Sequence, residues 1–222
     1  MTRQRTQKID QVLNRRQPDL TVLLENVHKP HNLAAIIRSS DAAGVHQVHA
    51  IPVASGLPKL AHTSQGSQKW VRVIKHETTA DAIRHLQDSG HNLVAAHFSK
   101  QAVDFRELDY TRPTAIVFGA EKLGLSQTML DAVDDEIIIP MLGMTPSLNV
   151  SVACAVILYE AMQQRLTAGM YDQRRLDDQT WARSRFEWLH PKLARYCQKH
   201  QRDYPALDEA GELLEPIPHA TR

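Results

Sequence analysis

Three segments of the chain place polar side chains after a run of apolar residues with the length of a buried strand. Asparagine, serine and glutamate in such loops can bind a polar ligand through hydrogen bonds, and an arginine can clamp an anion. In an open α/β sheet, ligands bind at the carboxyl ends of the strands, where such loops meet. The candidate site residues of the three segments are Asn32, Arg38, Gly119, Glu121, Ser147 and Asn149.

These side chains also have structural explanations. Arg38 follows Ile36 and Ile37, so it is either a surface residue or a buried anion clamp, and its type alone favours the surface. Glu121 can cap the turn that follows it, and Asn149 can satisfy free amides at the start of a helix. The residues by themselves leave both interpretations open.

The glycine pair Gly119 and Gly124 imitates a phosphate-binding loop without completing it. That motif requires a lysine directly after its second glycine, and Leu125 stands there. No G-x-G-x-x-G occurs, which removes the fingerprint of the dinucleotide-binding fold. The loop before Asn149 is instead rich in apolar residues, which suits a pocket wall whose backbone groups bind an adenine edge.

The apolar pattern predicts alternating strands and helices. Strands are expected at residues 20–27, 45–51, 70–74, 92–98, 114–119 and 136–140. Helices are expected at residues 32–44, 78–90 and 148–166, with another that begins near Ser126. Such alternation forms a mainly parallel sheet with helices on both faces, so we predict an α/β fold.

The charges are distributed unevenly, although 26 basic and 25 acidic residues give a net charge of only +1. Residues 1–16 carry five basic residues and one acidic residue, and residues 165–202 carry nine and four. Residues 17–164, in contrast, carry eleven basic and fifteen acidic residues. Two basic arms that flank an acidic body suit a polyanion, but exposed helices also collect lysine and arginine, and charge alone does not decide between these explanations.

We expect three parts: a basic N-terminal helical arm (1–18), a central domain (19–168) and a C-terminal helical extension whose last twenty residues form a loosely ordered tail (169–222). With 42% apolar and 23% charged residues, the composition excludes disordered and collagen-like chains. Residues 137–159 are uncharged, but their prolines and glycine favour a strand, a loop and a buried helix over a membrane span. The two distant cysteines and the lack of metal-ligand spacing argue against metal, and a cytoplasmic location fits.

Together the three segments closely resemble the motifs of the SpoU family, within the SPOUT class of RNA methyltransferases. The similarity runs through residues 15–32, 102–122 and 139–161 and is strongest to the TrmH type. The resemblance implies transfer of a methyl group from S-adenosylmethionine (SAM) to the ribose 2′-hydroxyl of guanosine 18 in the tRNA D-loop. It also implies a homodimer and a deep C-terminal trefoil knot. The sequence pattern alone would have excluded the knot, because knots are nearly absent among folds.

The resemblance also assigns roles to residues. The catalytic group contains Arg38, supported by Asn32, Glu121, Ser147 and Asn149. Because a guanidinium stays protonated, we expect Arg38 to clamp a phosphate and stabilise developing alkoxide charge instead of acting as the base.

The remaining assignments concern the cofactor and the RNA. SAM is expected to bind largely through backbone groups of Ala96, Gly119, Ile139, Met141 and Leu148. The tRNA phosphates are expected to contact Lys8, Arg15, Arg16 and Arg165.

Two other functions compete with tRNA methylation. Relatives with the same motifs act on ribosomal RNA, but those commonly carry a separate N-terminal RNA-binding domain, and only about twenty residues precede the first strand here. A non-catalytic RNA-binding protein could also use this fold, although the presence of Arg38 and Asn149 speaks against it.

Overall fold

A computed structural model of the chain describes residues 2–53, 56, 69–121 and 123–215. Most of the loop expected after residue 51 and the last seven residues of the tail lie outside this description. The chain forms two compact units, one made of residues 17–170 and the other of residues 1–16 together with 171–222.

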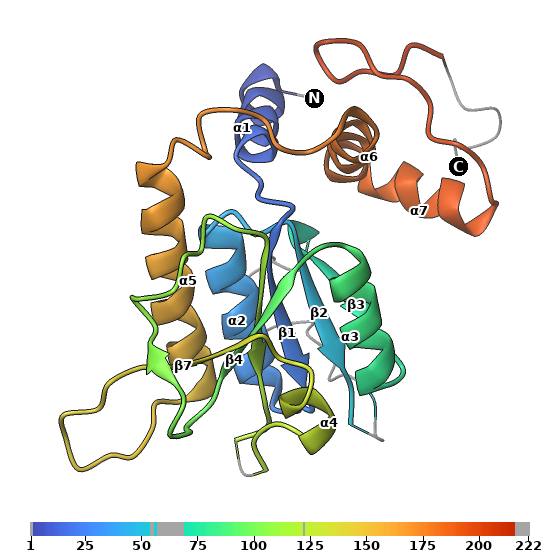
Figure 1. Cartoon of the computed structure of the whole chain (residues 1–222). Helices are drawn as coiled ribbons and strands as arrows, with labels where there is room; N and C mark the ends of the chain where they lie inside the picture. The colour runs from blue at the N-terminus through green and yellow to red at the C-terminus, as the bar shows by residue number, and fades with distance from the viewer. Residues whose placement is uncertain (1, 54–55, 57–68, 122, 216–222) are drawn as a thin grey trace. The chain divides into compact units, whose positions relative to one another are not determined.

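The larger unit is built on a seven-stranded sheet in which every pair of neighbouring strands is parallel (Figure 1). The strand order is β3-β2-β1-β6-β4-β7-β5. The strands are β1 (Leu20–Glu25), β2 (Gln47–Ile51), β3 (Arg72–Lys75), β4 (Asn92–Ala96), β5 (Val103–Asp104), β6 (Thr114–Phe118) and β7 (Asp135–Ile138). The predicted parallel α/β sheet is confirmed. Only β5 was not expected, because a strand of two residues has no apolar period of its own.

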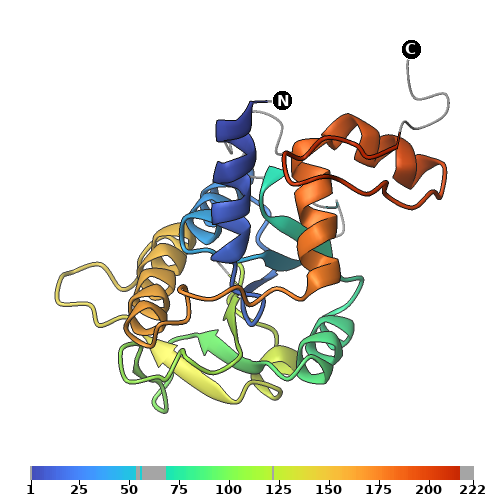
Figure 2. The same cartoon turned by 90° about the horizontal axis from the view of Figure 1, so that it is seen from above.

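Alternate side chains of the strands pack into two separate hydrophobic cores, one on each face of the sheet. In β1, Val22 and Leu24 belong to the core under helices α2 (Pro30–Ala42) and α5 (Val150–Thr167), whereas Leu23 faces the opposite core. That opposite core contains α3 (Thr79–Asp88) and α4 (Gln127–Leu130). Figure 2 shows the α2 and α5 pair and α3 on opposite sides of the sheet.

The helix ends follow local chemistry. Helix α2 starts at Pro30, two residues before the expected Asn32, because proline suits the first turn of a helix. Thr78 caps α3 by accepting from the amide of Asp81, and Asn149 caps α5 by accepting from the amide of Ser151. The uncharged run 137–159 thus divides into the end of β7, a loop and the start of α5, and no helix among the described residues is long and apolar enough to cross a membrane.

The smaller unit contains α1 (Arg3–Asn14), α6 (Asp178–Leu189) and α7 (Pro191–Lys199). Helix α1 packs against α6, so the two basic segments that the sequence separates meet in one unit. Arg185, only 6% exposed, pairs with Asp10 at 2.8 Å and donates to the carbonyl oxygens of Asp208 and Glu209. The prediction of a loose tail is therefore wrong for its described part, because a buried guanidinium binds its backbone.

Candidate functional site: a pocket at the strand ends

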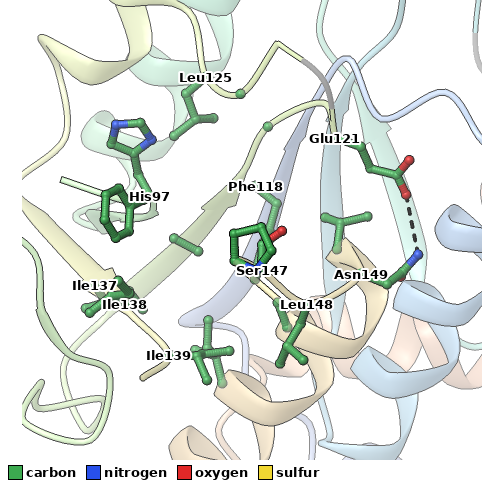
Figure 3. A pocket seen from close by; sticks show the side chains of 18 of the residues that line it. His97, Phe118, Glu121, Leu125, Ile137, Ile138, Ile139, Ser147, Leu148 and Asn149 are labelled. Atoms are coloured by element: carbon green, nitrogen blue, oxygen red, sulfur yellow. Dashed lines mark hydrogen bonds between the residues drawn. The ribbon is translucent and has the colours of Figure 1, made fainter. Parts of the chain in front are cut away.

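A pocket of about 410 Å³ opens at the carboxyl ends of β4, β6 and β7 (Figure 3). Its walls are mostly apolar and include Phe118, Ile137 and Val150. The strand ends and the loops that follow them bring all five expected cofactor residues to its lining: Ala96, Gly119, Ile139, Met141 and Leu148. Glu121, Ser147 and Asn149 line it as well.

The loop after β6 is a tight turn that depends on its glycines. A Cβ at Gly119 would lie 2.3 Å from the backbone carbon of Gly124, so no larger residue fits there. The amide of Ala120 donates to the Gly124 carbonyl at 3.1 Å, and the Gly124 amide donates back at 2.8 Å. Gly124 itself has a φ of 66°, which favours glycine. The glycine pair that imitates a phosphate loop in the sequence thus closes this turn.

A cluster of amides and one carboxylate lies at the polar rim of the pocket, where Glu121 and Asn149 line it and Asn32 and Lys29 contact Glu121 without lining it. The Asn32 side-chain amide donates to Glu121 Oε1 at 2.6 Å, and the Asn149 amide donates to the same oxygen at 3.4 Å (Figure 3 marks the latter bond). The Asn149 amide also lies 3.2 Å from Asn32 Oδ1. The Lys29 ammonium pairs with the other Glu121 oxygen. Contact with Lys29, and then the bond from Asn32, holds the pKa of Glu121 below its usual value.

Asn149 caps a helix and also belongs to the polar cluster. Its Oδ1 accepts from the amide of Ser151 at 2.8 Å and from the Ser151 hydroxyl at 2.7 Å, which is helix capping. Its amide nitrogen faces Asn32 and Glu121, which joins the start of α5 to the rim. Ser147 lines the pocket, and in the described part of the chain it makes no hydrogen bond to this cluster.

Arg38 does not meet the other candidate residues within one chain. Asn32 and Arg38 are six residues apart on α2, which at 3.6 residues per turn points them about 120° apart. Asn32 is 1% exposed and faces Glu121, whereas Arg38 is exposed and absent from the pocket lining. Among the described residues, Arg38 has no hydrogen bond or ion pair, so the surface interpretation holds for the single chain.

Two of the four expected RNA contacts are buried. Arg165 is 0% exposed; it pairs with Asp19 at 2.7 Å and donates to the carbonyl oxygens of Tyr110 and Arg112. Arg16, also 0% exposed, places its guanidinium 5.2 Å from the ring centre of Trp188. A guanidinium enclosed by protein cannot contact a phosphate, so the expectation is wrong for Arg16 and Arg165. Lys8 and Arg15 are exposed.

Lys29 is a site residue that sequence reasoning missed. The one signal for it in the sequence is the position of Lys29 directly before Pro30 at the start of α2. That signal is weak, because a lysine at the start of a helix can have many roles. The described residues include no group of three or more histidine, cysteine or acidic side chains placed to hold a metal ion.

A parallel sheet whose strand-end loops enclose an apolar pocket with a polar rim defines an α/β protein that binds a small organic ligand. The chain belongs to the SpoU methylase family. Residues 19–159 match the model described as "SpoU rRNA Methylase family", and residues 163–216 match "SpoU, rRNA methylase, C-terminal".

Individual relatives agree with the family assignment. The tRNA (guanosine(18)-2'-O)-methyltransferase of Escherichia coli (strain K12) is 50% identical over 208 residues, which cover 93% of this chain and 91% of that protein. The crystal structure of the A. aeolicus TrmH/SpoU tRNA modifying enzyme matches with a TM-score of 0.79 and 39% identity, over 83% of this chain and 94% of that one. The SpoU methyltransferase AviRb from Streptomyces viridochromogenes, in complex with AdoMet, matches with a TM-score of 0.62 and 29% identity, over 68% and 62%.

Proposed function

We propose that the chain transfers a methyl group from SAM to the ribose 2′-hydroxyl of guanosine 18 in tRNA. The observation that carries the proposal is the convergence of three distant segments on one pocket: Asn32, Glu121 and Asn149 meet at its rim. The close similarity to the E. coli tRNA (guanosine(18)-2'-O)-methyltransferase over 93% of the chain supports the same reaction and substrate.

The pocket fits SAM by its chemistry. Its volume of about 410 Å³ lies in the usual range for small organic ligands, and its apolar walls suit an adenine ring and a thioether chain. Gly119, Ile139 and Leu148 line the pocket, which supports the expectation that their backbone groups bind the adenine and ribose edges. The related AviRb binds AdoMet in its crystal structure. When bound, SAM supplies a methyl group on a sulfonium.

The chain's own residues orient the reactants. The Asn32, Glu121 and Asn149 cluster joins α2, the loop after β6 and the start of α5, and so fixes three walls of the site relative to one another. Lys29, and then Asn32, lower the pKa of Glu121, and its ionised carboxylate accepts these hydrogen bonds. Arg38 clamps the phosphate beside the target ribose and stabilises negative charge on the 2′-oxygen, while phosphate or water accepts the proton.

We further propose that the enzyme is a homodimer in which Arg38 of one copy serves the pocket of the other. Val152, Tyr159 and Leu166 repeat every seven residues on one side of α5 and are 47%, 50% and 48% exposed. Leu142 and Met144, in the loop that borders the pocket, are completely exposed. A second copy that covers this apolar surface would approach the pocket, and α2, which carries Arg38, packs beside α5.

The proposal also includes the tRNA contacts, the cellular location and the knot. Lys8 and Arg15 remain as the exposed candidates for tRNA phosphate contacts, and a tRNA substrate would place the protein in the cytoplasm. The chain is expected to be knotted near the pocket, where the loops after β4, β6 and β7 meet.

Incubation of the purified chain with labelled SAM and an unmodified tRNA transcript tests the reaction. We expect label on the ribose of guanosine 18 and none in a matched transcript whose guanosine 18 already carries a 2′-O-methyl group. Label on a base, or label only in ribosomal RNA, would refute the proposed substrate. Arg38→Ala should lose methyl transfer and keep SAM binding.

A further inference from the structure

A buried carboxylate, that of Glu25, is hydrogen-bonded to the end of the loop after β6 that lines the pocket. Glu25, the last residue of β1, is 1% exposed and accepts three hydrogen bonds. Its Oε2 accepts from the amide of Ser126 at 2.8 Å. Its Oε1 accepts from the Ser126 hydroxyl and from the Thr79 hydroxyl, each at 2.7 Å.

The partners of Glu25 are hydroxyls and an amide. Within the part of the chain that the structure describes, Glu25 forms no ion pair. Burial of a carboxylate is costly unless hydrogen bonds replace its water, and charge-assisted hydrogen bonds are short and strong. The two segments that contain Ser126 and Thr79 are therefore held firmly to the end of β1.

Ser126 ends the loop after β6, whose described residues are 119–121 and 123–126 and which forms one wall of the pocket. Leu125, directly before it, lines the pocket, and so do Gly119 and Gly124. The Ser126 hydroxyl also accepts from the amide of Met129 at 3.2 Å, which starts α4. The position of Ser126 thus fixes both the end of the loop and the start of α4.

The loop is consequently held at two places. On the rim, Glu121 binds Asn32 and Lys29. At its base, Ser126 binds Glu25 through both its amide and its hydroxyl. Gly119 and Gly124, which approach each other closely on either side of Glu121, line the pocket, so a shift of this loop would alter the pocket wall.

We propose that Glu25 is a positioning residue for SAM, because it holds Ser126 and thereby the pocket-lining residues Gly124 and Leu125 in the positions that the pocket requires. The inference rests on the proposed function, because it takes SAM as the ligand. Glu25 does not line the pocket, so it acts through Ser126. Its loss should weaken SAM binding and raise the KM for SAM, with less effect on kcat at saturating SAM and on tRNA affinity.

Ser126 and Thr79 provide a matched pair of variants. Both hydroxyls donate to the same Glu25 oxygen at 2.7 Å, but only Ser126 belongs to the pocket loop, whereas Thr79 opens α3. Calorimetric titration of the full chain with SAM should show Kd raised about tenfold in Ser126→Ala, the order of one charge-assisted hydrogen bond. Thr79→Ala should lower the Tm but keep the wild-type Kd.

Conservative variants separate positioning from simple loss of stability. Ser126→Thr keeps the hydroxyl and the amide at an exposed position, so it should restore the wild-type Kd. Glu25→Gln keeps the shape without the charge and should raise the Kd and the KM for SAM while the chain remains folded.

The outcomes distinguish this inference from the proposed function. Wild-type SAM affinity in Ser126→Ala and Glu25→Gln, or equal weakening in Thr79→Ala, would overturn the role of Glu25 and leave the proposed reaction intact. Absence of SAM binding by the unaltered chain would overturn the proposed function itself, and the positioning role with it.

Discussion

The amide nitrogen of Asn32 lies 2.6 Å from Glu121 Oε1, although 89 residues separate the two in the chain. This bond joins a helix that starts beside β1 to the loop that follows β6, and these two strands are neighbours in the sheet. The order of the parallel strands therefore brings the two sides of the pocket rim together.

Replacement of Asn32 tests the rim directly. Asn32→Asp places a second carboxyl group against Glu121, whereas Asn32→Ala only removes the donor. Loss of one hydrogen bond to a charged group should lower methyl transfer about 10- to 100-fold in either variant at neutral pH. In Asn32→Asp alone, part of the activity should return at lower pH, because one of two adjacent carboxyls then holds a proton. Parallel pH profiles for the two variants would contradict this account.

Arg165 should prove to be a structural residue. Arg165→Ala leaves the Asp19 carboxylate and three backbone carbonyls without their buried partner, so we expect the free energy of unfolding to fall by about 3–5 kcal/mol. Urea denaturation measures this loss. A folded Arg165→Ala with normal stability and weakened tRNA binding would restore the RNA-contact interpretation.

Lys8 should behave in the opposite way, because it is exposed. Lys8→Ala should leave the urea midpoint unchanged and reduce the slope of log affinity for tRNA against log salt concentration by about one. Binding measured over a series of salt concentrations gives this slope. An unchanged slope would remove Lys8 from the RNA interface.

Mixed dimers test the proposed sharing of Arg38. A heterodimer of Arg38→Ala and Asn149→Ala subunits, isolated through two different tags, contains one pocket in which the pocket residue and the partner's arginine are both intact. It should recover about half of the wild-type methyl transfer, although each homodimer is inactive. If Arg38 serves its own chain, the heterodimer has no complete site and stays inactive.

The histidines between β2, β3 and α3 should make the protein sensitive to acid. The rings of His49, His76 and His85 lie 5.1–5.2 Å apart, and His49 shares a 2.8 Å hydrogen bond with His76. Burial, and then the neighbouring histidines, lower the pKa of His49 to about 3. Burial also lowers the pKa of His76. Both rings are therefore neutral in the folded protein near neutral pH.

Below about pH 6.5, His49 binds a proton in the unfolded chain but stays neutral in the folded protein. The free energy of unfolding must therefore fall as the pH falls. For His49 the loss should reach about 2 kcal/mol by pH 5. His49→Gln should flatten the pH dependence of the urea midpoint, whereas His200→Gln, at an exposed position, should not. Equal pH dependence in wild type and His49→Gln would refute the explanation.

The parallel α/β sheet and the three segments of the site were predictable from the amino-acid sequence. Continuous apolar runs such as residues 114–119 predict strands that are buried on both faces, because this pattern is local. The sequence also indicated Asn149 as a helix cap, which the structure confirms through the Ser151 amide.

Which polar residues meet depends on the folding of the whole chain. Arg165 and Lys8 are both basic residues on helices, yet one is enclosed by the carbonyls of Tyr110 and Arg112 and the other is exposed. Lys29 and Glu25 gained their roles from Glu121 and Ser126, about a hundred residues away. Such partners come together through the order of strands in the sheet, and a residue's type and local spacing carry no record of that order.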